Sequence, residues 1–296
     1  MPRIRTDQAE GLRRMLARSR LRVVSVSDSA TADGRLSAIV NLAGALAELG
    51  SDPLIVDEHP PANGIVAALG LTPRYDLQDV IRGRREIDDL IVRGPAGIRI
   101  LPLARGAGGV LRLPAADRQS FIERCRRPGF PVDTVLMSAV HDGEGARLWQ
   151  ASSAQDVVVL SGGGVAAITA AYASIKRLST EFARREFHIL VSNVASEREA
   201  KVIFGNMASV ARRYLRVSLH LMGHVPPDVK LQLAARLRLP VGAAFPAAAS
   251  AENFRSLAQS IIGWPQAVEC DGGLDGFFRR LVHPGHLHAT AIETSH

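Results

Sequence analysis

A strand–loop–helix near the start of the chain has the outline of a phosphate-binding loop. The segment VVSVSDSATADGRLSAIVNLAGALAELG contains an apolar strand, a loop of small residues and a helix that ends at Gly50. Such loops need glycines so that backbone N–H groups approach phosphates, a lysine for the β- and γ-phosphates, and Ser or Thr for Mg²⁺. This loop has one glycine, Gly34, followed by Arg35 and Leu36. Leucine cannot ligate magnesium, so the residues alone favour an ordinary strand-to-helix turn over a nucleotide site.

Short apolar runs alternate with helical patterns along the rest of the chain. This alternation predicts an α/β fold with a doubly wound, mostly parallel sheet of about seven or eight strands flanked by helices. The strands are expected at Leu21–Ser27, Pro53–Asp57, Ile98–Leu103, Asp133–Ser138, Asp156–Ser161, His188–Asn193 and Val217–Val225. The clearest helical patterns are Leu36–Leu49, Ala115–Arg126, Ala166–Leu178 and Phe254–Ile262.

The chain divides into an N-terminal arm (1–20), one domain (21–282) and a tail (283–296) that we expect to be disordered. In doubly wound sheets, ligands bind beyond the carboxyl ends of the strands. Chemistry is therefore expected in the loops after Ser27, Asp57, Ser138 and Asn193.

Composition excludes several classes of protein. Hydrophobic residues make up 47% and charged residues 22% of the 296 residues, and the N-terminus is polar rather than a secretory signal. We therefore expect a cytoplasmic protein. The two cysteines, Cys125 and Cys270, have no CxxC partner, which argues against disulfides and thiolate zinc sites. The histidines of HPGHLH near the C-terminus lack acidic or thiol neighbours, so no metal site is expected.

The formal net charge is +7, and most of the excess lies at the N-terminus. Met1 to Arg22 holds seven arginines against Asp7 and Glu10. This balance permits binding to anionic lipid, nucleic acid or acidic proteins without choosing among them.

Longer segments of the sequence indicate a family more specifically than the loop does. VNLAGALAELG, the segment from LIVDEHPPANG to ILPLARG, and then DTVLMS, AITAAYASIKRLS, LVSNVAS, GHVPPD and LDGFFRRLV closely resemble the FlhG (FleN, YlxH) family of MinD/ParA-type proteins. The resemblance covers about Asp7 to Val282 and implies a MinD/ParA-like P-loop fold.

The family carries a KGGxGKT loop, and this chain departs from it. The signature lysine, which bridges an ATP-bound dimer in the family, falls on Ala30, and the second lysine falls on Arg35. The Mg²⁺-binding threonine falls on Leu36, and Asp33 adds a carboxylate beside the phosphates. With the signature lysine absent, we expect a monomer or an ATP-independent dimer.

Two further family positions are changed. The family's DxD keeps its first aspartate as Asp57, but the second, associated with the attacking water, is His59. The Walker B aspartate falls on Ser138. Phosphoryl transfer is mostly positioning and charge neutralisation around Mg²⁺. We therefore expect no catalytic residue and no required cofactor. Weak ATP or ADP binding through Arg35 stays open.

The positions that recognise adenine in the family are better kept. Asn193, Pro226 and Asp228 match them. The residues themselves leave another reading open, because Asn is common in turns and Pro stops strands.

The arm contains DQAEGLR, which matches the DQAxxLR element of the family at every fixed position. In FlhG proteins this element stimulates FlhF, a GTPase of the signal-recognition-particle type. The resemblance implies that Asp7, Gln8, Ala9, Leu12 and Arg13 contact FlhF, with Gln8 as the candidate for orienting water or γ-phosphate.

The sequence thus predicts a FlhG-like regulator of flagellar number or placement, built on a pseudo-ATPase and stimulating FlhF. Flagellar transcriptional or basal-body proteins are further candidate partners. LDGFFRRLV (274–282) predicts an amphipathic helix that either touches the inner face of the membrane or docks on the domain. Two rival functions are a slow ATPase that uses Arg35 and Asp57, and a DNA- or membrane-surface module that uses the basic arm. Of these surfaces, nucleic acid is the least expected.

Overall fold

The computed structural model describes residues 21–27, 32–60, 62–103, 110, 113–125, 129–139, 154–265 and 273–282. The arm with Asp7, Gln8, Ala9, Leu12 and Arg13, the position Ala30, Cys270 and the tail lie outside the described residues. Within the described part, no helix combines the length and the apolar character needed to cross a membrane.

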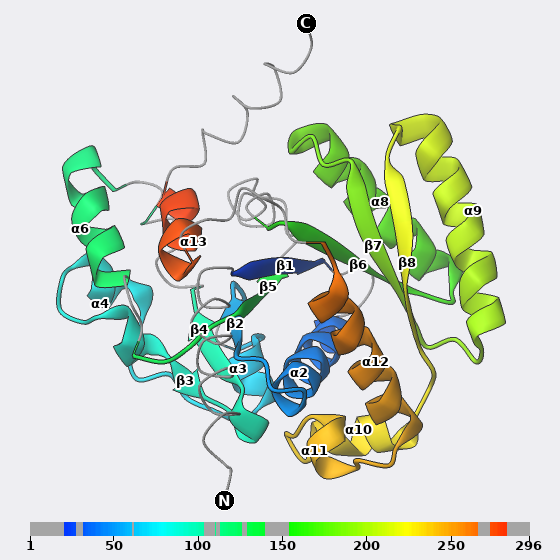
Figure 1. Ribbon diagram of the computed structural model, residues 1–296, viewed down its shortest axis with the longest axis horizontal. Helices are drawn as coiled ribbons and strands as arrows, with labels where there is room; N and C mark the ends of the chain where they lie inside the picture. The colour runs from blue at the N-terminus through cyan, green and yellow to red at the C-terminus, as the bar shows by residue number, and fades with distance from the viewer. Residues whose placement is uncertain are drawn as a thin grey trace, which may run out of the picture.

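One eight-stranded sheet organises the molecule, with strand order β3-β4-β2-β5-β1-β6-β7-β8 (Figure 1). The strands are β1 (Arg22–Ser27), β2 (Pro53–Asp57), β3 (Val92–Arg93), β4 (Arg99–Pro102), β5 (Thr134–Ala139), β6 (Asp156–Gly162), β7 (Glu186–Ser192) and β8 (Ser218–Val225). All neighbours are parallel except β3 and β4. The doubly wound, mostly parallel sheet expected from the sequence is therefore confirmed. The two-residue β3 was not expected, because it is too short to give a hydrophobic pattern.

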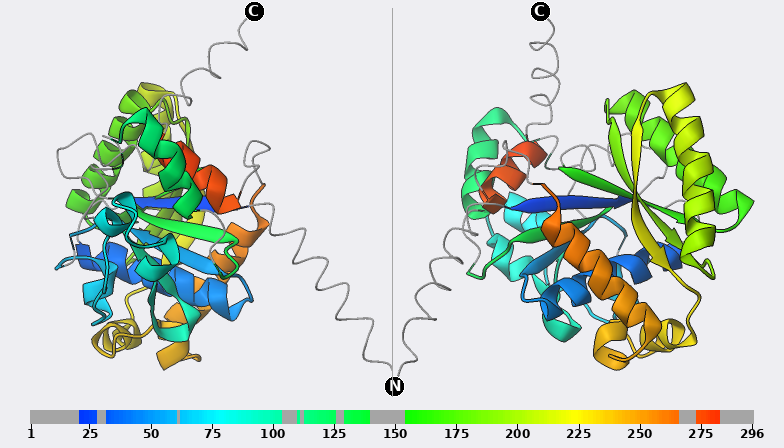
Figure 2. Two further views of the ribbon diagram at one scale, coloured as in Figure 1. Left: turned by 90° about the vertical axis from the view of Figure 1, so that its left-hand side faces the viewer. Right: turned by 45° about the vertical axis from the view of Figure 1, so that its right-hand side comes forward.

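Helices cover both faces of the sheet (Figures 1 and 2). One face packs against α2 (Ala32–Glu48), α3 (Ile65–Ala68), α11 (Val241–Ala244) and α12 (Ala249–Gly263), with α10 (Val229–Arg236) outside them. The other face packs against α4 (Leu77–Ile81), η1 (Ile87–Leu90), α6 (Ala115–Cys125), α8 (Val165–Glu181), α9 (Glu197–Leu215) and α13 (Gly273–Val282). A short turn, η2 (Pro95–Gly97), precedes β4. Burial on both sides explains why the central strands are apolar at consecutive positions.

The C-terminal helix α13 docks on the domain. Phe277 and Phe278 are fully buried in the cluster that includes α6. The ring of Phe278 meets that of Phe121 edge to face, with centroids 6.5 Å apart. The sequence left two alternatives for this helix, contact with a membrane or docking on the domain. In the structure both phenylalanines are docked on the domain. Membrane binding through them would require the helix to leave this cluster.

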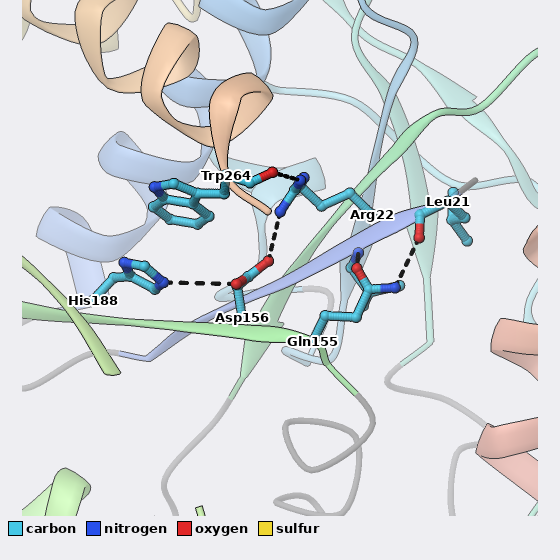
Figure 3. A network of polar contacts seen from close by, with 7 residues as sticks. Leu21, Arg22, Gln155, Asp156, His188 and Trp264 are labelled. Atoms are coloured by element: carbon cyan, nitrogen blue, oxygen red, sulfur yellow. Dashed lines mark hydrogen bonds and ion pairs between the residues drawn. The ribbon is translucent and has the colours of Figure 1, made fainter. Parts of the chain in front are cut away.

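A polar network ties the amino ends of the strands to the end of α12 (Figure 3). Arg22 donates to Oδ2 of Asp156 at 2.9 Å and to the carbonyl oxygen of Trp264 at 2.6 Å. The indole of Trp264 stacks on the imidazole of His188, with centroids 3.8 Å apart, and Nε2 of His188 lies 3.6 Å from Asp156. The network fixes Arg22, at the start of β1, to Trp264, the residue that follows α12.

Candidate functional site

The sheet brings together Asp57, which matches the family pattern, and two positions that depart from it, His59 and Ser138. Asp57 is the last residue of β2, and it pairs in register with Ser138 on β5. Ser138 also pairs with Val26 near the end of β1. His59 follows β2 by two residues, so all three side chains meet at the carboxyl edge of the sheet. This is the edge at which doubly wound folds bind their ligands.

Both carboxylate oxygens of Asp57 contact groups of the protein itself. Oδ1 accepts a hydrogen bond from the backbone N–H of His59 at 3.1 Å and lies 2.9 Å from Nδ1 of the same residue. Oδ2 accepts from the N–H of Ile65, the first residue of α3, at 2.7 Å. The side chain is 2% exposed. A carboxylate whose two oxygens contact two backbone N–H donors and an imidazole nitrogen is not presented to a metal ion.

His59 and Ser138 complete a closed trio. The Ser138 hydroxyl lies 3.1 Å from Nδ1 of His59, the same nitrogen that contacts Asp57. His59 is 5% exposed and Ser138 is 0% exposed. In a hydrolase triad the acid and the nucleophile contact opposite nitrogens of the imidazole. Here both contact Nδ1, while Nε2 is buried and has no partner in the described part of the chain. The trio therefore has the geometry of a structural network rather than of a nucleophile and its base.

Gly64 is a residue of this site that the sequence reasoning missed. It precedes α3, and a Cβ built on it would lie 2.4 Å from Oδ2 of Asp57. Glycine at this position lets the Asp57 carboxylate reach the start of α3. The signal in the sequence was the glycine between the acidic strand end and the next helix, but its partner could be found only from the coordinates.

At the α2 position where the resemblance implies a magnesium-binding threonine, this chain has Leu36. Leu36 is buried in the core cluster between the sheet and α2, whereas Gly34 is exposed. The side chain of Arg35 lies outside the described residues. The hydrocarbon that replaces the metal-binding hydroxyl is thus part of the core of the domain.

The three candidate adenine positions lie near one another at the ends of β7 and β8. The N–H of Asn193 donates to the carbonyl oxygen of Val225 at 2.8 Å, so Asn193 and Pro226 are neighbours. Asn193 is exposed and left-handed, with φ of 57°. Asn tolerates this region better than most residues, which is a structural reason for its presence.

Asp228 has a structural role at the start of α10. Its carboxylate caps α10 by accepting from the N–H of Lys230 at 2.8 Å, and it accepts from the hydroxyl of Ser250 at 2.6 Å. The hydrogen bond from Ser250 holds the pKa of Asp228 below its ordinary value. These bonds explain Asp228 without a ligand, and they leave the adenine role as a proposal.

These residues do not fit the Mg²⁺ that P-loop nucleotide sites employ. Magnesium is bound through carboxylates, hydroxyls and phosphates in octahedral geometry. Asp57 is fully engaged, Ser138 is bonded to an imidazole, and Leu36 has no oxygen to offer. No group of three or more His, Cys, Asp or Glu residues with metal-binding potential occurs in the described ranges.

Solved structures place the fold in a known class. The chain is similar to the MinD cell division protein of Aquifex aeolicus, with a TM-score of 0.61, 17% identity, and coverage of 84% of this chain and 99% of that one. It is also similar to the septum site-determining protein MinD complexed with Mg-ADP from Pyrococcus horikoshii, with a TM-score of 0.59, 17% identity, and coverage of 82% and 96%. The fold is that of the MinD/ParA-type P-loop proteins.

Sequence comparison narrows this class to a family. The chain is 30% identical over 265 residues to the antiactivator FleN of Pseudomonas aeruginosa, covering 89% of this chain and 95% of the relative. It is 25% identical over 264 residues to an uncharacterized ATP-binding protein of Methanocaldococcus jannaschii, covering 88% and 94%. No protein-family model matches the chain. By its identity to FleN along nearly the whole length, the chain belongs to the FlhG/FleN family.

Proposed function

We propose that this protein is a regulator of flagellar number or placement that acts by binding and does not turn over ATP. The observation that carries the proposal is the closed Asp57–His59–Ser138 trio. Phosphoryl transfer requires Mg²⁺ and a positioned water beside the phosphates. In this chain the metal- and water-positioning sites hold side chains bonded to one another. Membership in the FleN family supports the regulatory role.

The proposed output is stimulation of a FlhF-type GTPase by the arm. Asp7, Gln8, Ala9, Leu12 and Arg13 form the matching DQAxxLR element. A polar side chain that a partner inserts beside a γ-phosphate accelerates hydrolysis by orienting the attacking water. Gln8 belongs to the arm and not to the P-loop segment, so the proposal gives a nucleotide at the P-loop position no part in this activity. Weak ATP or ADP binding by Arg35 and the Asn193 side of the site is compatible with it.

The test is GTP hydrolysis by the cognate FlhF with and without this protein, in the absence of ATP. Gln8→Ala is compared with Glu10→Ala, which changes a variable position of the same element and serves as the matched control. We expect stimulation by the wild type and Glu10→Ala and its loss in Gln8→Ala. A FlhF rate unchanged by the wild-type protein would contradict the proposal.

Two rival functions make different predictions. A slow ATPase would bind Mg-ATP measurably as the wild type and would gain turnover from Leu36→Thr combined with Ser138→Asp. A basic surface module would bind duplex DNA with a steep loss at high salt, or would bind lipid until the arm is removed. Neither result is expected from the proposed regulator.

A further inference from the structure

Helix α10 presents an apolar ridge that the fold leaves uncovered. Val229, Leu233 and Leu237, which we call the α10 ridge, are 69%, 40% and 58% exposed. They are spaced by four residues, so they follow one another along one side of the helix. The opposite side is used internally, because Ala234 is fully buried and Leu231 packs against the core. Contiguous exposed apolar patches on soluble proteins often mark binding sites, whereas isolated exposed apolar side chains need no explanation.

Cations border the ridge on both sides. At 3.6 residues per turn, Arg236 falls on one side of the line from Val229 to Leu237, and Lys230 falls on the other. Both side chains are exposed, and Arg238 follows the ridge. Within the described ranges, neither the Lys230 ammonium nor the Arg236 guanidinium forms a hydrogen bond or ion pair. The face therefore combines an aliphatic centre with positively charged margins.

Three carboxylates near α10 have partners within the domain. Asp228 caps the helix and binds Ser250. Glu48 on α2 and Glu252 on α12 both pair with Arg255, with an Nε–Oε1 distance of 3.0 Å for Glu48. Glu48 and Glu252 are therefore paired with a cation other than Lys230 and Arg236, whereas Asp228 lies beside Lys230 and offsets part of its charge. Figure 1 shows α10 at the outer end of the α2–α12 layer, where a partner has access from outside.

We propose that the α10 ridge docks an acidic amphipathic helix of a partner protein. An amphipathic helix covers such a ridge with apolar residues at i, i+3, i+4 and i+7. Carboxylates beside that stripe would face Lys230 and Arg236. Docking a second copy through its own α10 is disfavoured, because it would bring like charges together. A lipid surface is a weaker fit, since interfacial helices spread a wide apolar face that often carries Trp or Phe.

The experiment uses full-length protein and a displayed library of helical peptides. Each peptide has fixed leucines along one stripe, and the flanking positions vary among Glu, Gln and Lys. We expect selection on the wild type to enrich Glu at the flanks. The affinity of the enriched peptides should fall by at least about tenfold with Leu233→Ser plus Leu237→Ser. Ile262→Ser, which removes a 49% exposed apolar side chain from α12, is the matched control and should leave the affinity unchanged.

A charge reversal and a lipid control separate the remaining outcomes. Lys230→Glu with Arg236→Glu should shift the enrichment from Glu to Lys. Enrichment that ignores the flanking charge, or that persists in the Leu233/Leu237 variant, overturns the proposal. So does ridge-dependent binding to phosphatidylglycerol vesicles without any peptide enrichment, which would identify a membrane surface. Because the arm and the trio are unchanged in these variants, failure here is distinguishable from failure of the proposed FlhF function.

Discussion

The carboxylate of Asp57 and the imidazole of His59 bond to each other across two residues of chain, with Oδ1 and Nδ1 2.9 Å apart. The resemblance to the FlhG family implies a second aspartate, associated with the attacking water, at the position of His59. Replacing the second acid with an imidazole gives Asp57 an internal partner, and Ser138 adds a neutral hydroxyl to it. His59 and Ser138 are therefore coupled: with Asp57 they form a buried hydrogen-bonded network at the carboxyl edge of the sheet.

Gly64→Ala tests how tightly this network is packed. The new methyl group would lie 2.4 Å from Oδ2 of Asp57, so the carboxylate would have to move away from Ile65 and His59. We expect the free energy of unfolding to fall by about 1–3 kcal/mol, as measured by urea denaturation. Gly164→Ala is a matched control, since Gly164 also precedes a helix and a Cβ there would meet nothing within 4 Å. Equal effects of the two substitutions would show that the Asp57 contact is unimportant for stability.

Gly44→Ala tests the contact between α2 and Pro240, the residue that precedes α11. A Cβ on Gly44 would lie 2.6 Å from Cβ of Pro240, whose ring cannot turn aside. The overpacking should outweigh the gain in helix propensity and lower the midpoint of thermal unfolding, with a loss of about 1–3 kcal/mol. In α9, Gly205 has open space around it, and Gly205→Ala should instead stabilise the protein by about 0.5–1 kcal/mol. Stabilisation by both substitutions would contradict the packing described for α2.

Arg22→Ala tests the network at the opposite edge of the sheet. Arg22 is buried, and its loss would leave Asp156 without its closest cation and the Trp264 carbonyl without its donor. We expect a loss of about 2–4 kcal/mol in chemical denaturation. The exposed i,i+4 pair of Arg177 with Glu181 provides the control, because Arg177→Ala should cost less than about 0.5 kcal/mol. A comparable cost for both variants would mean that burial does not strengthen the Arg22 contacts.

Asp133 gives the fold a dependence on pH. Burial, together with the nearby Asp52 carboxylate, raises the pKa of Asp133 above its ordinary value, despite hydrogen bonds that act the other way. The folded state then holds the proton more tightly than the unfolded state does. The stability associated with this group is fully present below the unfolded pKa and is lost as pH rises through the folded pKa. Asp133→Asn removes this titration, so its stability relative to wild type should increase as pH is raised from about 4 to 7.

Urea unfolding of both proteins across that range measures the difference. Glu181→Gln, which removes a carboxylate from an exposed position, is the control for the change in net charge. A difference between Asp133→Asn and wild type that stays constant with pH would contradict the raised pKa.

Much of the fold could be predicted because its signals are local. Runs such as Val157 to Leu160 are apolar at consecutive positions, which is typical of strands covered on both faces, and the structure has β6 there. The docking of α13 could not be chosen from sequence, because the same apolar face suits a membrane or a groove formed by α6. Only the coordinates show Phe278 against Phe121.

The sequence predicted which family residues are replaced at the candidate site. It did not predict the contacts that the replacing residues make. The family pattern identified Asp57 as a kept aspartate and His59 and Ser138 as replacements. That the replacements bond to one another depends on the register of β2 against β5, which pairs Asp57 with Ser138. Both strands are buried on both faces, so no alternating hydrophobic pattern fixes the register between these segments, which lie some eighty residues apart.

Hydrolysis of Mg-ATP by the purified full-length protein tests the central claim most directly. Because Asp57, His59 and Ser138 bond to one another and Leu36 lies in the core, we predict phosphate release no faster than in a sample without protein. Arg35→Ala should give the same result, since no turnover depends on that side chain. Phosphate release above the blank that is lost in Arg35→Ala would contradict the account and identify the chain as an active ATPase with a variant phosphate loop.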